Sequence, residues 1–289
     1  MAEETGWVRS PDGVKLAVRE WPGDGPDLIL AHGLASTSHI FDRVVPLLVP
    51  HFHVVAYDQR GHGRSGKPGA RFGFDHTAPD LLAVIDQTKL RRPVAVGHSW
   101  GGNVVLEAAA RAPRSLSGAI LLDGGFTSLR HMDWPTVRTT LAPPPIAGMR
   151  LQEFLSLVRR HVGPSLGWGP EVEALFLSIV HVNREGRIRP RLSRRNHMRI
   201  LHALWAQDPM ALLRTIEVPT LALATRLSAS KGPDPQFGDS KRHAAHALRE
   251  LGGPFRFEWI EGIHDVPMQR PRAVARRIGR FVREVATGA

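Results

Sequence analysis

A serine between two glycines, at the end of an apolar run, is the first feature of this sequence that could do chemistry. The stretch 94–103 reads VAVGHSWGGN, so Gly97, Ser99 and Gly101 form the pattern G-x-S-x-G between a predicted strand and a predicted helix. Only small residues two positions before and after the serine let strand and helix approach so closely in a sharp turn. Because open α/β folds bind ligands at the carboxyl edge of the sheet, this turn predicts that Ser99 is an exposed nucleophile.

A serine hydroxyl is a weak nucleophile until a base takes its proton, so this hypothesis requires a histidine and a carboxylate that orients it. Among the fifteen histidines, His264 has the most suitable position, because EGIHDVPMQRP follows the last predicted strand and precedes the last predicted helix. This position returns His264 to the same edge of the sheet as Ser99. We therefore predict His264 as the general base.

The main chain beside these residues predicts an oxyanion hole. His32 follows an earlier strand at the same edge, but the pair His32 and Gly33 favours a turn in which the next backbone N–H points into the site. We expect the main-chain amides of Leu34 and Trp100 to stabilise a developing oxyanion.

Short apolar runs alternate with amphipathic stretches along the chain, and these elements must position the candidate residues. The predicted strands, short and bounded by glycine or proline, are 14–21, 27–33, 52–58, 93–99, 118–124, 220–225 and 255–262. The predicted helices between them are 76–89, 102–112, 240–251 and 271–286. Strands that alternate with helices imply βαβ units and a doubly wound, parallel sheet.

The alternation stops after Gly125, and no strand pattern is found as far as Arg214. The helical stretches in this region are 151–161, 170–182 and 195–207, separated by segments rich in proline and glycine. We expect residues 126–214 to form a mostly helical cap over Ser99. The core domain would then consist of residues 1–125 and 215–289.

Five motifs carry a resemblance to a known family: HGLAS, YDQRGHGRSGKP, GHSWGG, AILLDGG and GIHDVPMQRP. In this order and at these spacings the chain resembles an α/β-hydrolase over nearly its whole length apart from the cap. The resemblance implies a mostly parallel eight-stranded sheet, a cap inserted after the sixth strand, and a triad in the order nucleophile, acid, histidine. It also assigns Asp58 and Arg60 to folding and not to chemistry.

The acid is the point at which the sequence departs from the usual pattern of the family. Members generally carry it just after the seventh strand, but PTLALATRLSAS offers no carboxylate at the expected distance from Pro219. Asp123, at the end of the sixth predicted strand, resembles the acid of those members that use this strand, and we favour it. Asp234 and Asp239, which follow later in the chain, remain alternatives.

Composition excludes several classes of protein. The chain has no cysteine, so it has neither a disulfide framework, nor a thiolate metal site, nor a catalytic cysteine. A serine nucleophile at position 99 argues against the haloalkane dehalogenases and epoxide hydrolases of this fold, which use aspartate there. The first residues contain early acids and no apolar core of a signal peptide, and no later stretch has the length of a membrane span. We expect a cytoplasmic protein without a membrane partner.

The basic charge of the chain comes mainly from arginine. The formal net charge is +11, yet only five of the 38 basic residues are lysine. Arginines concentrate in the segment 184–199 and in the last predicted helix, without zinc-finger spacing, an RNA-binding signature or interleaved aromatic residues. We interpret them as a solvated surface and expect no nucleic-acid partner, although the role of segment 184–199 stays open.

Together these features predict a serine hydrolase that cleaves a carboxylic ester or lactone of a small to medium apolar substrate through an acyl-enzyme. No metal and no organic cofactor is expected, and the protein would act as a monomer or homodimer. The apolar substrate is inferred from aromatic residues in the predicted cap: Trp134, Phe154, Trp168, Phe176 and Trp205. The alternatives are a carbon–carbon bond hydrolase or a cofactor-free perhydrolase with the same triad, and a non-catalytic ligand-binding protein.

Overall fold

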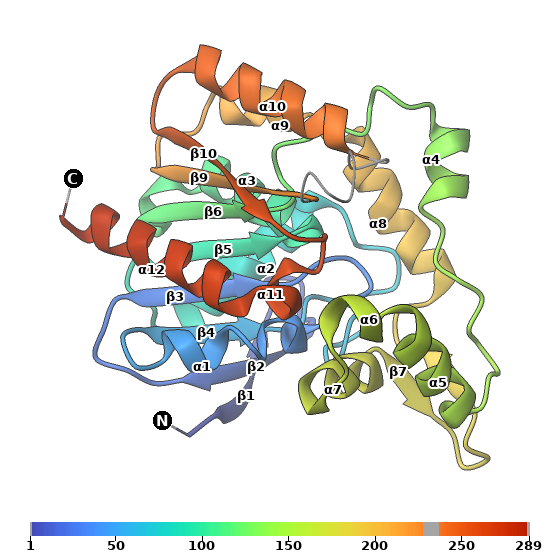
Figure 1. The fold of residues 1–289 in the computed structure, drawn as a ribbon. Coiled ribbons are helices and arrows are strands. Elements are labelled where there is room, and N and C mark those ends of the chain that lie inside the picture. The colour runs from blue at the N-terminus through green and yellow to red at the C-terminus, as the bar shows by residue number, and fades with distance from the viewer. Residues whose placement is uncertain (1, 228–236, 288–289) are drawn as a thin grey trace.

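An eight-stranded sheet forms the centre of the computed structural model, which describes residues 2–227 and 237–287 (Figure 1). The strand order is β1-β2-β4-β3-β5-β6-β9-β10. Only the pairs β1–β2 and β2–β4 are antiparallel, so the predicted mostly parallel sheet is confirmed. The strands are β1 (Glu4–Arg9), β2 (Lys15–Trp21), β3 (Asp27–Ala31), β4 (His53–Tyr57), β5 (Val94–His98), β6 (Gly118–Leu122), β9 (Thr220–Arg226) and β10 (Phe255–Glu261).

Helices cover both faces of this sheet (Figure 1). The longer core helices are α2 (Phe74–Gln87), α3 (Trp100–Arg111), α10 (Gly238–Leu251) and α12 (Pro271–Thr287); the short ones are α1 (Val45–Leu48) and α11 (Val266–Gln269), with 3-10 turns η1 (Ser38–Phe41) and η2 (Pro113–Ser115). Alternate side chains of β3 separate the two layers: Ile29 packs in the cluster with α2, α3 and α10, and Leu30 packs in the cluster with α1 and α12. The central strands are apolar on both faces because each face is covered by helices.

The segment between β6 and β9 contains the helices that were predicted to form a cap. These are α4 (Trp134–Thr140), α5 (Leu151–His161), α6 (Gly163–Leu166), α7 (Pro170–Ser178), α8 (Arg194–Ala206) and α9 (Pro209–Leu213). The expectation that this segment contains no strand is wrong, because β7 (Val180–Val182) and β8 (Ile188–Pro190) form an antiparallel hairpin. The predicted helix 170–182 accordingly ends at Ser178.

Turn chemistry explains this hairpin. The Asn183 carboxamide oxygen accepts hydrogen bonds from the amides of Glu185 and Arg187, and Gly186 has a φ of +73°. An asparagine that closes a turn onto the backbone, followed by a glycine in the left-handed region, reverses the chain in a few residues. The run 180–182, VHV, is therefore extended instead of continuing the helix.

Strand β1 was also missed by the sequence analysis. Its six residues pair with β2 at the edge of the sheet, but only Val8 is buried, so the segment lacks the apolar alternation that identifies a strand. Strand β1 is held in place by its pairing with β2 and not by burial of its own side chains.

Candidate active site

Ser99 lies in the sharp turn between β5 and α3, with φ +54° and ψ −125°. A positive φ is unfavourable for any residue with a side chain, so the surrounding packing must hold this conformation. A Cβ at Gly97 would lie 2.2 Å from the Gly101 carbonyl oxygen, and a Cβ at Gly101 would lie 2.2 Å from the Ala31 carbonyl oxygen. Both predicted glycine positions therefore have no room for a side chain.

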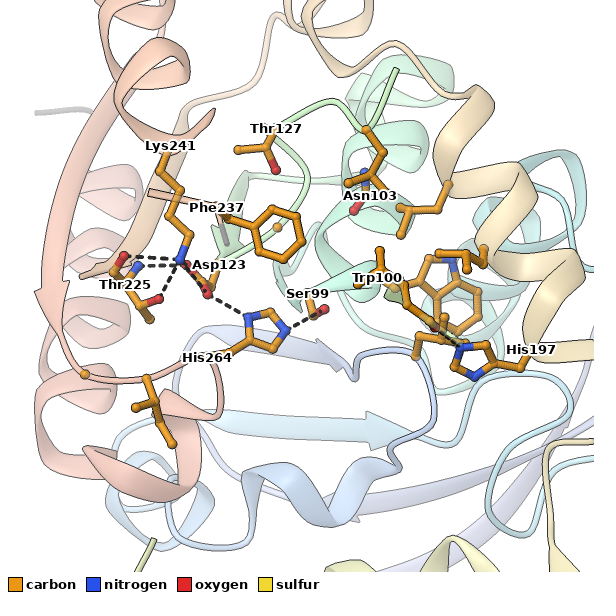
Figure 2. A pocket seen from close by; sticks show the side chains of 18 of the residues that line it. Ser99, Trp100, Asn103, Asp123, Thr127, His197, Thr225, Phe237, Lys241 and His264 are labelled. Carbon is orange, nitrogen blue, oxygen red and sulfur yellow. Dashed lines mark hydrogen bonds and ion pairs between the residues drawn. The ribbon is translucent and has the colours of Figure 1, made fainter. Parts of the chain in front are cut away.

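His264 follows β10 in the loop before α11, and its ring lies beside Ser99 (Figure 2). The distance from His264 Nε2 to Ser99 Oγ is 2.9 Å, and 54% of the His264 side chain is exposed. In the tautomer with hydrogen on Nδ1, the Ser99 hydroxyl donates to Nε2. The base predicted from the sequence is thus within reach of the predicted nucleophile.

Asp123 directly follows β6, with a φ of +51° and a side chain that is fully buried. Its Oδ2 accepts a hydrogen bond of 2.7 Å from His264 Nδ1, and its Oδ1 accepts one of 2.7 Å from the Thr225 amide. The structure therefore brings the favoured acid to the ring nitrogen that faces away from Ser99.

The other candidate acids do not occupy this position among the described residues. Asp239 lies in the first turn of α10 with 85% of its side chain exposed, and its carboxylate pairs with Arg242. Asp234 lies outside the described residues. Of the carboxylates that the structure describes, Asp123 is the one hydrogen-bonded to the His264 ring.

The charges in this cluster lower the pKa of Asp123 and raise the pKa of His264. Burial would raise the pKa of Asp123, but the hydrogen bond and charge of His264, followed by the charge of Lys241, hold this pKa well below its usual range. Burial would lower the pKa of His264, but the hydrogen bond and charge of Asp123, followed by the charge of Asp265, raise it above its ordinary value. Asp123 therefore stays ionised and stabilises the imidazolium that forms when His264 accepts a proton.

Three further residues that the sequence analysis did not select support this cluster. His98, beside Ser99, donates from Nε2 to the His264 carbonyl oxygen at 2.9 Å, which ties the histidine loop to β5. Burial and the charge of His264 lower the pKa of His98 to about 4, so this donor is neutral near pH 7. Thr225 and Lys241 contact the Asp123 carboxylate directly. The position of His98 next to the nucleophile was the one signal in the sequence that could have indicated a role.

The two predicted oxyanion donors, Leu34 and Trp100, line the same cavity as Ser99. Trp100 is the first residue of α3, where backbone N–H groups have no partner within the helix. Gly33 explains how the other loop approaches: a Cβ there would lie 2.9 Å from Ser99 Cβ and 3.4 Å from Ser99 Oγ. His32 itself is buried, and its Nε2 accepts a hydrogen bond from the Gln59 amide.

A cavity of about 540 Å³ opens above these groups. Its wall is largely apolar, and four leucines come from the segment 126–214: Leu129, Leu141, Leu201 and Leu204. Thr127 and Asn103 add polar groups (Figure 2). The carboxamide of Asn103 is already engaged, since it donates to Gln207 and accepts from the Gly125 amide. The arrangement leaves a mostly apolar chamber with its reactive groups at one side.

The residues assigned to folding are bonded inside the protein. Asp58 accepts from the amide and hydroxyl of Ser38, and Arg60 pairs with Asp12 and Asp80. In the described ranges, no group of three or more histidines and carboxylates has the arrangement of a metal site. No helix within those ranges combines the length and the apolar character that a membrane span requires.

The arginine-rich segment 184–199 lies at β8 and the start of α8. Three of its arginines donate to main-chain carbonyls: Arg187 to Gly148, Arg194 to Pro143 and Arg199 to Gly69. These contacts connect the segment to neighbouring loops.

Comparisons with known proteins agree with this fold. The family model of the alpha/beta hydrolase fold matches residues 26–153. The solved structure of E-2-(acetamidomethylene)succinate hydrolase superposes with a TM-score of 0.77 at 21% identity, covering 97% of this chain and 99% of the other. The chain therefore has the α/β-hydrolase fold that its motifs predicted.

Two curated relatives match part of the chain. The probable oxidoreductase EphD of Mycobacterium tuberculosis is 44% identical over 108 residues, which are 36% of this chain and 18% of that protein. The bifunctional esterase/perhydrolase DCH of Acinetobacter calcoaceticus is 37% identical over 120 residues, 40% of this chain and 44% of that protein. The match spans less than half the length of each relative.

Proposed function

We propose that this α/β-hydrolase is a serine hydrolase that cleaves a carboxylic ester or lactone through an acyl-enzyme. The observation that carries the proposal is the hydrogen-bonded series Ser99 Oγ, His264 and Asp123, with distances of 2.9 Å and 2.7 Å, at the wall of a mostly apolar cavity. A hydroxyl, an imidazole and a buried carboxylate in this order are the parts that acyl transfer requires.

In the proposed reaction, His264 takes the Ser99 proton as Oγ attacks the substrate carbonyl carbon. The Leu34 and Trp100 amides stabilise the oxyanion, which is worth about a hundredfold to a thousandfold per donor. His264 then protonates the leaving alcohol, so the ester C–O bond breaks and the acyl group stays on Ser99. Water, deprotonated by His264, releases the acid and restores the Ser99 hydroxyl. Positioned proton transfer contributes about a hundredfold to ten-thousandfold.

The cavity favours a neutral acyl group of small to medium size. Its volume of about 540 Å³ lies within the range of ordinary small-molecule sites. Its charged groups, Asp123 and Lys241, are paired with each other at 3.0 Å, so they offer little attraction to a charged substrate. We further propose that residues 126–214 act as the cap of this site, because leucines from this segment line the cavity.

A second candidate is perhydrolysis, in which hydrogen peroxide instead of water accepts the acyl group and a peracid leaves. The similarity to the esterase/perhydrolase DCH favours testing it, since both reactions share the acyl-enzyme. A carbon–carbon bond hydrolase stays an alternative, whereas the relatives named as hydrolases and esterases argue against a non-catalytic binding protein. A cytoplasmic location and a monomer or homodimer stay predictions.

The proposal is tested by reacting the protein with a fluorophosphonate probe and with p-nitrophenyl esters from acetate to dodecanoate, alongside simple lactones and an assay for peracid. We expect the probe to label Ser99, with the highest kcat/KM on short to medium esters. Ser99→Ala abolishes turnover without loss of thermal stability. Ser36→Ala is the matched control, because its buried hydroxyl has no hydrogen-bond partner among the described residues. Labelling at another residue, or full turnover in Ser99→Ala, would contradict the proposal.

A further inference from the structure

A buried lysine contacts the acid of the candidate triad. Lys241, on the first turn of α10, is 6% exposed, and its Nζ lies 3.0 Å from Asp123 Oδ1 and 3.2 Å from Asp123 Oδ2. The same Nζ donates to the Thr225 carbonyl oxygen at 3.2 Å and to the Thr225 hydroxyl at 2.9 Å (Figure 2). One ammonium group therefore connects α10, the end of β9 and the residue that follows β6.

Burying an ammonium group is unfavourable unless it is paired and hydrogen-bonded. A methionine or leucine would fill the same space without that cost, so packing alone does not account for a lysine here. Within the described ranges, Lys241 bonds to Asp123 and to Thr225, whose own amide binds Asp123. The direct contact and the contact through Thr225 both support the carboxylate that orients His264.

We propose that Lys241 is a positioning residue, which fixes the Asp123 carboxylate against β9 and supplies its countercharge, so that the acid can act on His264 from the end of β6. This inference rests on the proposed function. Without Lys241 the carboxylate keeps the Thr225 amide at Oδ1 and the His264 ring at Oδ2, and it loses the contact that spans both oxygens. Rotation of the carboxylate then weakens the hydrogen bond that holds the His264 ring.

The countercharge has a second consequence, for the basicity of His264. The charged and titratable groups around the ring, among the described residues, are Asp123 after β6, Lys241 on α10, Asp265 in its own loop and His98 on β5. The two carboxylates raise the pKa of His264, and the charge of Lys241 lowers it. Removing the lysine charge while the Asp123–His264 hydrogen bond is kept therefore raises the pKa of His264 and moves the acid limb of kcat/KM to higher pH.

Two variants separate position from charge. Lys241→Met keeps the length of the side chain and removes both charge and hydrogen bonds. We expect kcat to fall by about 10- to 100-fold, the cost of one charge-assisted hydrogen bond, with KM nearly unchanged. Lys241→Gln keeps a neutral donor to the carboxylate and removes the charge, so kcat recovers substantially while the acid limb moves to higher pH.

The matched control is Arg242→Met, which removes the neighbouring cation on the same helix. Arg242 is 59% exposed and pairs with Asp239, so kcat and the acid limb should equal those of the unmodified protein. A double-mutant cycle adds a second criterion. If Lys241 acts through Asp123, then Lys241→Met in an Asp123→Asn background changes kcat/KM much less than it does alone.

The His264 titration, followed by NMR in the unmodified protein and in both lysine variants, is a readout that needs no substrate. This titration separates a failure of this inference from a failure of the proposed function. If Lys241→Met does not fold, the titration is measured in Lys241→Gln alone. A higher His264 pKa in Lys241→Gln supports the inference. An unchanged titration and acid limb in Lys241→Gln overturn it, even if kcat falls, because a purely structural role would leave both unmoved.

Discussion

Replacing Asp123 by asparagine should reverse the tautomer of His264. The Thr225 amide donates to Oδ1 at 2.7 Å and Lys241 Nζ lies 3.0 Å from the same oxygen, so this position must stay an acceptor. The asparagine oxygen therefore takes the place of Oδ1, and its NH₂ group takes the place of Oδ2, 2.7 Å from His264 Nδ1. An NH₂ group can only donate to that nitrogen.

The magnitude follows from this exchange. With Nδ1 as an acceptor, the hydrogen of neutral His264 sits on Nε2, which faces the Ser99 hydroxyl and can no longer take its proton. The same substitution in a serine-protease triad leaves the geometry intact and lowers kcat about ten-thousandfold, which corresponds to about 5.4 kcal/mol of transition-state stabilisation. We expect a loss of this order for Asp123→Asn, with KM changed little.

The assay is burst-phase release of p-nitrophenol, which measures acylation of Ser99 directly, together with thermal unfolding to confirm that the variant folds. Asp239→Asn is the matched control, because Asp239 is exposed, pairs with Arg242 and should not affect acylation. Retention of more than a tenth of the acylation rate in Asp123→Asn would refute the argument from the tautomer. So would a large loss in Asp239→Asn alone.

Further predictions concern the base, the oxyanion loop, the cavity and the arginines. Protonated His264 cannot accept the Ser99 proton and its pKa is raised, so kcat/KM measured across pH should be lost as the pH falls through a midpoint above the ordinary histidine value of about 6.5; a midpoint below 6.5 contradicts this. Gly33→Ala places a Cβ 2.9 Å from Ser99 Cβ, and should lower kcat about a hundredfold with the fold intact in circular dichroism. Leu204→Trp fills part of the cavity, and should lower kcat/KM for dodecanoate more than for acetate esters. An equal loss of kcat/KM for both esters would mean that the acyl chain of the substrate does not lie beside Leu204. Because the arginines of segment 184–199 are interpreted as a solvated surface, the protein should not bind random duplex DNA with sub-micromolar affinity in a gel-shift titration at about 150 mM salt.

The nucleophile turn could be predicted from the sequence because its residues are contiguous and form a short pattern. Ser99 needs a positive φ, and the glycines at 97 and 101 are required by contacts within the adjoining strand, helix and neighbouring strand. The strands β3 to β6 were equally evident, because strands covered by helices on both faces are apolar throughout. His264 was found by its place between the last strand and the last helix. For these features, the identity and order of the residues were enough.

The acid and its support were decided only by tertiary structure. The family resemblance favoured Asp123, but residue type and spacing alone left Asp239 open, because both residues follow strands that end near the same edge. The choice depends on direction: the positive φ of Asp123 turns its carboxylate toward His264, 141 residues later, whereas Asp239 faces solvent on α10. Lys241 lies 118 residues from Asp123 and is one of five lysines without any local pattern that marks it. Contacts between distant elements depend on how the chain packs as a whole. The sequence therefore determined the nucleophile and its base, whereas the fold decided which carboxylate contacts His264 and which cation contacts that carboxylate.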